Sequence, residues 1–409
     1  MAALDFPSSP TNGQVYGAYT YDSTKGAWNV TPQTQASVTT SDTAPVNPKS
    51  GDQWFYTVDG TMFVYYSDGT SSQWVEQPKS IAGGYSYYRS PNFLINGAFD
   101  IWQRGTTGTP TSSATRYVAD RWETYRVSYA AGLTVSRQTA TDAALLPNIQ
   151  YCMRVQRTAA NAGTVAIYAG QALETVNSIP LAGKTVTLSF YARAGANYSS
   201  GGNALVAQVQ TGTGTDQNMT GLTGVATPIS QNATLTTSWQ KFSYTGTIAT
   251  SATQVGVLFL YTPVGTAGAA DYFEITGVML EEGTAATSFR RHAPSIQAEL
   301  AACQRYYVIH KGAGQAPVCW GMGFTSNLMS TGQKFPVPMR TTAPTVTIYS
   351  YAGTANKVSV VNNASDVGTT VTAGTTQMND MGFFYVVDSG TGFSLNQHYW
   401  FWYTASAEL

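Results

Sequence analysis

The strongest constraint on this chain is an alternation of apolar and polar residues with a period of two, which recurs along most of its length. Between Lys184 and Arg193, for example, Val186, Leu188 and Phe190 would share one face, and the intervening Thr and Ser residues the other. This pattern is typical of an antiparallel β-strand with one buried face. We therefore expect a chain built mainly from strands.

Further segments rich in aromatic and β-branched residues predict more strands. They lie at 151–157, 240–245, 254–261, 272–280, 318–324, 345–349, 383–387 and 398–403. About ten strands between residues 92 and 280 suit a two-sheet sandwich or jelly roll. The strand at 398–403 is aromatic on both faces, so we expect both faces to be buried.

One segment, from Ser295 to Tyr307, has helical spacing, because Ile296, Leu300, Cys303 and Tyr307 would form one apolar stripe. Ser295 is a suitable N-cap. The predicted fold class is therefore all-β: small N-terminal β modules, a central antiparallel jelly-roll sandwich, one linking helix and a C-terminal β domain.

The first 80 residues contain a degenerate repeat in which two prolines, a glycine and an aromatic residue recur with an offset of 38 residues. The two copies are Pro7, Pro10, Gly13, Tyr16 and Pro45, Pro48, Gly51, Trp54. Each copy continues through an aromatic strand and a turn, Asp68-Gly69 in the second, to a closing tryptophan. Such small units lack a sizeable core, and their strand edges can add to a partner's sheet.

These patterns divide the chain into four parts. They are an N-terminal β module at 1–35, a second module with a linker at 36–90, the jelly-roll domain at 91–294, and the helix with the C-terminal domain at 295–409. Segments rich in Thr, Ser, Gln and Gly at 31–44 and 77–91 are the expected linkers.

Charge and cysteine content exclude several classes of protein. Lys and Arg number 21 and Asp and Glu 22, so the net charge is −1, and nucleic-acid binding through a basic surface is not expected. No apolar run reaches the roughly 18 residues that cross a membrane, and the N-terminus has no secretory signal. Three widely spaced cysteines predict buried free thiols rather than disulfides. We expect a soluble protein made in a cytoplasm.

The sequence offers little catalytic or metal-binding chemistry. The adjacent Glu281 and Glu282 would diverge to opposite faces of a strand, although a carboxylate pair for glycan cleavage could still form between distant segments. No cofactor is expected. Asn96, Asp100 and Asp271 could hold a structural calcium ion, or could instead be turn residues that bind their own backbone.

Four aromatic residues near the C-terminus could form a platform on which a sugar stacks. They are Trp320, Trp400, Trp402 and Tyr403. The alternative is that these rings are core or subunit contacts, as aromatic residues in strands more often are.

Several segments together resemble bacteriophage tail-fibre and related virion proteins. They are NFLINGAFDIWQRG at 92–105, YVADRW at 117–122, VMLEEGTAATSFRR at 278–291, ELAACQRYY at 299–307, FPVPMRTTAPTV at 335–346 and ASAEL at 405–409. The resemblance spans about three quarters of the chain. It implies a non-enzymatic virion appendage, usually a homotrimer, with a jelly-roll module of the carbohydrate-binding type and a distal C-terminal domain that meets the host surface.

Residues and resemblance together predict a virion fibre that recognises a host-surface glycan. Its N-terminus would attach to other tail or capsid proteins, and its C-terminus would bind host polysaccharide or protein, weakly per site and multivalently. The aromatic strand at 398–403 would contribute to the trimer contact. A purely structural decoration or adaptor protein and a glycan depolymerase remain as alternatives.

Overall fold

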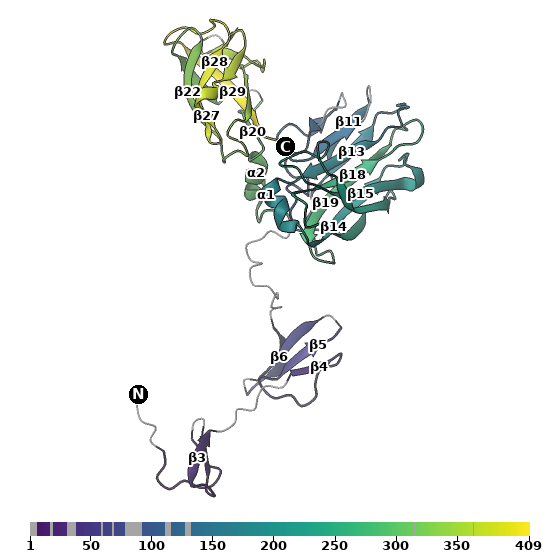
Figure 1. The fold of residues 1–409 in the computed structure, drawn as a ribbon, viewed down its shortest axis with the longest axis vertical. Coiled ribbons are helices and arrows are strands. Elements are labelled where there is room, and N and C mark those ends of the chain that lie inside the picture. Colours follow the sequence, from purple (N-terminus) through teal and green to yellow (C-terminus); the bar gives the residue numbers. More distant parts are fainter. Residues whose placement is uncertain are drawn as a thin grey trace. The chain divides into compact units, whose positions relative to one another are not determined.

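The computed structural model describes residues 6–16, 19–30, 38–58, 60–67, 69–77, 92–110, 116–126, 132–314, 316–362 and 364–409. The chain divides into two compact units, Met1–Tyr88 and Arg89–Leu409 (Figure 1). Most of the two expected linkers and Asp68 of the expected hairpin lie outside the described residues.

The first unit contains two small sheets, one from each copy of the repeat. The first joins β1 (Val15–Tyr16), β2 (Tyr19–Asp22) and β3 (Ala27–Val30). The second joins β4 (Val38–Ser41), β5 (Gln53–Tyr56), β6 (Thr61–Ser67) and β7 (Ser72–Glu76). Strands β1–β3 correspond to β5–β7, and both sets are antiparallel meanders.

The repeated glycines occupy the same structural position in the two copies. The amide of Gly13 donates to the carbonyl of Tyr21, and the amide of Gly51 donates to the carbonyl of Tyr65, each at 2.8 Å. Both glycines have positive φ, 80° and 94°, which explains why glycine recurs there. The repeat seen in the sequence is therefore a repeat in the structure.

Strand β4 makes the two copies different. It pairs in parallel with β5. The indole Nε1 of Trp54 also donates to the carbonyl of Ser41 at 3.2 Å. Trp54 is 8% exposed, whereas the corresponding Tyr16 is 40% exposed. The pairing of β4 with β5 thus accompanies the burial of Trp54 in the second module, whereas Tyr16 at the same position of the first module is exposed.

The second unit begins with a sandwich of two six-stranded antiparallel sheets. Sheet I has the order β16 (Ala226–Thr234), β15 (Ala204–Gly212), β18 (Gln254–Tyr261), β13 (Ile167–Ala172), β10 (Glu123–Arg126) and β9 (Arg116–Tyr117). Sheet II has the order β17 (Gln240–Thr247), β14 (Thr185–Ala194), β19 (Tyr272–Glu282), β12 (Tyr151–Arg157), β11 (Leu133–Thr139) and β8 (Thr107–Gly108). Between the sheets, Phe190 meets Phe259 edge to face with ring centroids 4.8 Å apart. The predicted all-β class is confirmed.

Strand β14 departs from the expectation of one solvent-facing side. Val186, Leu188 and Phe190 are buried as predicted, but Thr187 and Ser189 on the opposite face are buried too. The chain that follows β19 covers this face, because the Thr187 hydroxyl donates to the carbonyl of Gly283 at 2.8 Å. The alternation of residues within β14 cannot reveal that a later segment of the chain covers its second face.

The linking helix is shorter than predicted. Helix α2 spans Ile296–Gln304, and its N-cap Ser295 accepts a hydrogen bond from the amide of Ala298 at 3.2 Å, as expected. Tyr307 belongs instead to strand β20 (Tyr307–His310). The buried helix residues are Glu299 and Cys303, whereas Ile296 is 44% exposed, so the predicted apolar stripe is only partly correct.

Two other features concern helices and thiols. A four-residue helix, α1 (Thr175–Ser178), was not predicted. Within the described ranges, no helix is long and apolar enough to cross a membrane. Cys152, Cys303 and Cys319 are free and buried, as expected.

The C-terminal β domain is closed by its last strand, β29 (His398–Ser406). The other strands are β21 (Cys319–Gly323), β22 (Leu328–Lys334), β23 (Thr345–Tyr349), β24 (Val358–Val360), β25 (Asp366–Val367), β26 (Val371–Ala373), β27 (Met378–Asn379) and β28 (Gly382–Asp388). Pairing runs from β21 through β22, β28, β26 and β23 to β29, which also pairs with β21. The strands therefore form a closed ring around an apolar core.

A buried turn at 92–102 packs against strand β19 and against the segment that follows this strand. The Asn92 amide donates to the carbonyls of Val278 and Arg290 at 3.1 and 3.0 Å, and its oxygen accepts from the amide of Leu94 at 3.0 Å. A Cβ on Gly97 would overlap the carbonyl oxygen of Val278. Glycine is therefore needed where this turn crosses β19.

Gly97→Ala should lower the free energy of unfolding by about 1–3 kcal/mol, because the added methyl group has no space. Gly201→Ala is the matched control, since nothing lies within 4 Å of its Cβ. Urea unfolding of both variants measures the effect. Equal stability of the two variants would contradict the close approach.

Candidate functional site

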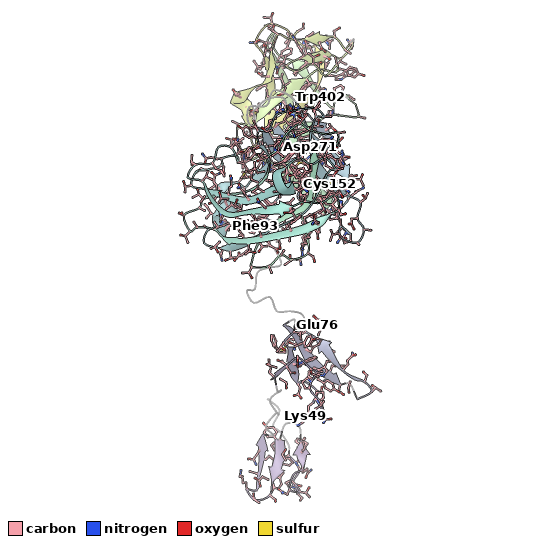
Figure 2. All side chains as sticks on the ribbon, turned by 90° about the vertical axis from the view of Figure 1, so that its right-hand side faces the viewer. Lys49, Glu76, Phe93, Cys152, Asp271 and Trp402 are labelled. Carbon is pink, nitrogen blue, oxygen red and sulfur yellow. The ribbon has the colours of Figure 1, made fainter. Side chains whose placement is uncertain are left out.

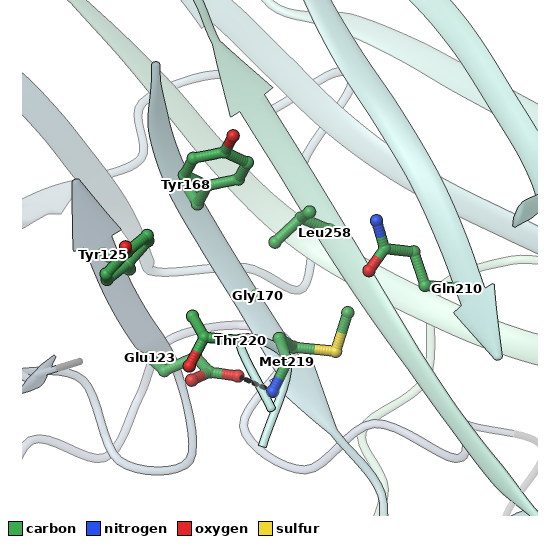
Figure 3. Close-up of a pocket in the computed structure, with 8 residues that line it drawn as sticks. All are labelled: Glu123, Tyr125, Tyr168, Gly170, Gln210, Met219, Thr220 and Leu258. Carbon is green, nitrogen blue, oxygen red and sulfur yellow. Dashed lines mark hydrogen bonds between the residues drawn. The ribbon is translucent and has the colours of Figure 1, made fainter. Parts of the chain in front are cut away.

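The outer face of sheet I carries a cavity of about 200 Å³ (Figure 3). Its lining comes from four neighbouring strands and one loop: Glu123, Tyr125, Tyr168, Gly170, Gln210, Met219, Thr220 and Leu258. Strand register assembles this set, because Glu123 lies opposite Gly170, and Gly170 opposite Leu258. We call this cavity the sheet I pocket.

Glycines in the sheet allow one wall of the pocket to form. A Cβ on Gly256 would overlap the sulfur of Met219, and a Cβ on Gly170 would lie 3.3 Å from Met219 Cγ. The loop between β15 and β16 can therefore place Met219 directly on the sheet. Met219, Leu258 and Ala172 form a small apolar cluster there, against which Tyr168 also packs.

Glu123 is the only ionisable carboxylate among the described residues that line the pocket. Its Oε1 accepts a hydrogen bond from the backbone amide of Met219 at 2.7 Å (Figure 3). Its Oε2 is buried and has no hydrogen-bond partner among the described residues. Burial raises the pKa of Glu123 to about 7. The carboxyl group can therefore donate or accept a hydrogen bond near neutral pH.

The rest of the lining combines two aromatic rings with an amide. Tyr125 and Tyr168 lie on adjacent strands with ring centroids 5.8 Å apart (Figure 3). The Gln210 amide donates to the side-chain oxygen of Gln208 at 2.8 Å, and the Gln208 amide donates to the Ser230 hydroxyl at 3.1 Å. This arrangement suits an uncharged ligand that has both an apolar face and several hydroxyl groups.

The four predicted aromatic residues do not all share one face. Trp320 lies directly opposite Trp400 in the pairing of β21 with β29, whereas Tyr403 belongs to the core of the domain. Trp320 is 61% exposed and Trp400 is half-buried, but Trp402 is 7% exposed and Tyr403 is fully buried. Trp402 (Figure 2) stacks on Tyr349 with ring centroids 4.0 Å apart. On β29, Tyr399, Phe401 and Tyr403 belong to the core of the C-terminal domain, whereas Trp400 and Trp402 lie outside that core cluster. Of the four, Trp320 alone presents most of its surface.

The three residues considered for calcium do not converge. Asp271 (Figure 2) is fully buried in an ion pair with Arg157 at 2.7 Å, so a guanidinium neutralises it. Asp100 pairs with Arg291 at 2.8 Å. The side-chain amide of Asn96 donates to the carbonyls of Ile101 and Asp120 at 2.9 and 3.0 Å. This agrees with the alternative that Asn96 is a turn residue that binds backbone groups. No group of three metal-ligating side chains occurs in the described part of the chain.

Glu281 and Glu282 diverge as predicted. Glu281 is buried, and its carboxylate accepts from the amide and the hydroxyl of Thr287, both at 2.8 Å. Glu282 faces solvent and pairs with Lys184 at 3.1 Å. The two carboxylates therefore do not form a catalytic pair.

The last residues of the chain hold one side of the sheet I pocket. Arg121 precedes β10, is 2% exposed, and forms an ion pair with Glu408. Arg121 also donates to the carbonyl of Ala172, the last residue of β13, at 2.7 Å. The strands that carry Glu123 and Tyr168 are thus tied to the tail.

The same tail holds the opposite wall. Arg340 donates to the carbonyls of Ala407 and Glu408 at 2.6 and 2.9 Å. Its guanidinium also pairs with Asp216 at 3.4 Å, in the loop that carries Met219. Both walls of the pocket therefore depend on contacts with the C-terminal residues.

Sequence reasoning missed the pocket, although one signal was present. Outward-facing positions in strands of the sandwich carry Glu123, Tyr125, Tyr168, Gln208 and Gln210, which are aromatic or hydrogen-bonding residues. A carboxylate that immediately follows the buried Trp122 was the most distinctive of these. Without the strand order, however, nothing placed these residues together.

No protein-family model and no curated protein matches the sequence. Among solved structures, the chain is similar to the enzymatically active domain of tailspike protein 4 of bacteriophage CBA120, with 11% identity and a TM-score of 0.31, over 47% of this chain and 22% of that chain. It is also similar to a CBM4 structure, with 17% identity and a TM-score of 0.28, over 46% and 98% of the two chains. A third similarity is to the CBM22-1 xylan-binding domain from Paenibacillus barcinonensis, with 12% identity and a TM-score of 0.27, over 48% and 98%. The chain thus spans about a fifth of the tailspike domain's length, and similarities at these values carry no conclusion about function.

Glu123→Gln should make the protein more stable at high pH but not at low pH. A carboxyl whose pKa rises from 4.5 to about 7 on folding favours the folded state while protonated, so this stability is lost as pH rises between those values. Above pH 7 the variant should gain up to about 3 kcal/mol over the natural protein. Urea unfolding at pH 4 and pH 8 tests this, and a difference that is equal at both values would contradict it.

Glu408→Gln should lower the free energy of unfolding by about 3 kcal/mol, because it leaves the buried Arg121 without its counter-ion. Glu282→Gln is the control, since its ion pair with Lys184 is about half exposed and should matter by less than about 1 kcal/mol. Thermal and urea unfolding measure both. A loss no larger than that of the control would show that the tail is not a structural tie.

Proposed function

We propose that this chain is a non-enzymatic, carbohydrate-binding fibre protein of a virion and that the sheet I pocket binds a neutral sugar of the host surface. The observation that carries the proposal is the combination of two tyrosine rings with the unpartnered Oε2 of Glu123. Pyranose rings offer an apolar C–H face to aromatic rings and hydroxyl groups to carboxyl and amide groups. The chain's low charge, 11%, also suits recognition that does not depend on charge.

Two features support binding rather than cleavage. Glycoside hydrolysis generally needs two carboxyl groups roughly 5–9 Å apart. Glu123 stands alone among the described residues that line the pocket, and Glu281 and Glu282 are used elsewhere. A depolymerase is therefore the weaker alternative, and new reducing ends in a host polysaccharide incubated with the protein would favour it.

The assignment to a virion rests on the motifs at 92–409 that resemble phage fibre proteins. Within this proposal the N-terminal modules attach to other virion proteins and the protein assembles as a homotrimer. Of the rings of β29, Tyr399, Phe401 and Tyr403 are buried within one chain but Trp400 is only half-buried, so the expected trimer contact stays a prediction. A structural decoration or adaptor protein remains the second candidate, and it would not bind intact host cells.

Tyr168→Ala should weaken binding of a neutral oligosaccharide at least tenfold, because one ring of the pocket is lost while the fold is kept. A panel of neutral bacterial oligosaccharides, screened by ligand-observed NMR, identifies the probe, and calorimetry with the full chain measures the affinity. Binding should change little with salt, since no net charge is involved.

Trp320→Ala is the matched control, because it removes the exposed ring that the sequence had suggested as part of the platform. Retained binding in this variant and loss in Tyr168→Ala support the sheet I pocket. The reverse result would move recognition to the C-terminal domain, and full binding by both variants would overturn the proposal.

A further inference from the structure

A second cavity, of about 310 Å³, lies where the sandwich meets the C-terminal domain. Arg104, Thr107, Arg116 and Tyr117 line it from the sandwich, and Tyr307 and Ser406 line it from β20 and β29. We call it the junction cavity. Because one water molecule occupies about 30 Å³ in the liquid, the cavity has room for several water molecules, and therefore for a monosaccharide in their place.

The described lining of the junction cavity carries positively charged side chains and no negatively charged ones. Two guanidinium groups line it, and none of the described residues in its lining carries a carboxylate. Arg104 forms an ion pair at 3.0 Å with Glu408, which does not line the cavity. A second carboxylate, that of Asp120, lies 4.0 Å from Arg104. Arg116 is exposed and forms no ion pair with any described residue. The uncompensated positive charge in the cavity is therefore that of Arg116.

The two arginines differ in how they are held. The guanidinium carbon of Arg104 lies over the ring of Tyr307, 3.5 Å from its centroid, and 5.6 Å from the ring centroid of Tyr117. Stacking and the ion pair with Glu408 fix its orientation before any ligand arrives. Its Nη1 is buried and has no hydrogen-bond partner among the described residues. A fixed guanidinium beside an unpaired one suits a planar anion such as a carboxylate.

We infer that the junction cavity binds the carboxylate of an acidic sugar, such as a uronic acid, as a site separate from the sheet I pocket. The hydroxyl groups of Thr107 and Ser406 offer hydrogen bonds to the rest of the sugar. The choice of a sugar rests on the proposed function, whereas the anionic character rests on the arginines. An acidic surface polysaccharide could thus be held at two points on one chain.

The test is titration of the full chain with glucuronate, glucose and sulfate, followed by NMR. Glucuronate should bind more tightly than glucose, and its binding should weaken as salt is raised. Arg116→Ala should weaken glucuronate binding about ten- to a hundredfold, the effect of losing a hydrogen bond to a charged group. Arg116→Lys should bind with intermediate affinity.

Lys184→Ala is the control, because it removes one exposed positive charge at the other end of sheet II. Equal binding of glucuronate and glucose, or an unchanged affinity in Arg116→Ala, overturns the inference. Binding of sulfate as tight as that of glucuronate assigns the cavity to inorganic anions instead and overturns the sugar assignment. Tyr168→Ala should leave glucuronate binding intact, so failure here is distinguishable from failure of the sheet I pocket.

Discussion

The second unit depends on one buried carboxylate, that of Glu408, which two arginines share. Arg121 and Arg104 both pair with it, and Arg121 is held in left-handed backbone geometry with φ of 68°. The ring of Tyr306 lies under the Arg121 guanidinium at 3.5 Å. A buried arginine without its partner would cost several kcal/mol, so this contact fixes how the turn before β10, the end of α2 and the chain's last residues meet.

The segments that resemble phage fibre proteins converge on this same junction. The backbone amide of Asn96 donates to the Glu299 carboxylate at 2.5 Å, and the Gln103 side-chain amide donates to the carbonyl of Tyr307 at 2.7 Å. Each contact joins two of the resembling segments. The resemblance therefore describes how the domains are held together. The pocket residues Tyr168 and Gln210 lie outside these segments.

Local patterns predicted the all-β class and several individual strands. Strands β12, β18 and β23 begin and end at the predicted residues, because period-two alternation and flanking turn residues are local properties. The end of α2 was misplaced, since pairing between β20 and β29 draws Tyr307 into a strand. The sequence left open whether Tyr403 belongs to a binding platform or to the core, because the closure of the ring of strands that buries it is a long-range property. The sheet I pocket was missed for the same reason: Glu123 and Leu258 meet only through the order of β10, β13 and β18.

The pairing of Arg121 with Glu408 also sets the timing of folding during synthesis. The two residues are separated by 287 positions, which a ribosome covers in about 15–60 s at roughly 5–20 residues per second. The strands of the sandwich are complete long before then, but one arginine at their edge waits for its counter-ion. The last strand of the C-terminal ring is made in the same final interval. A chain interrupted before that point would carry an open ring and an uncompensated charge, and incompletely folded chains are the ones on which chaperones and proteases act.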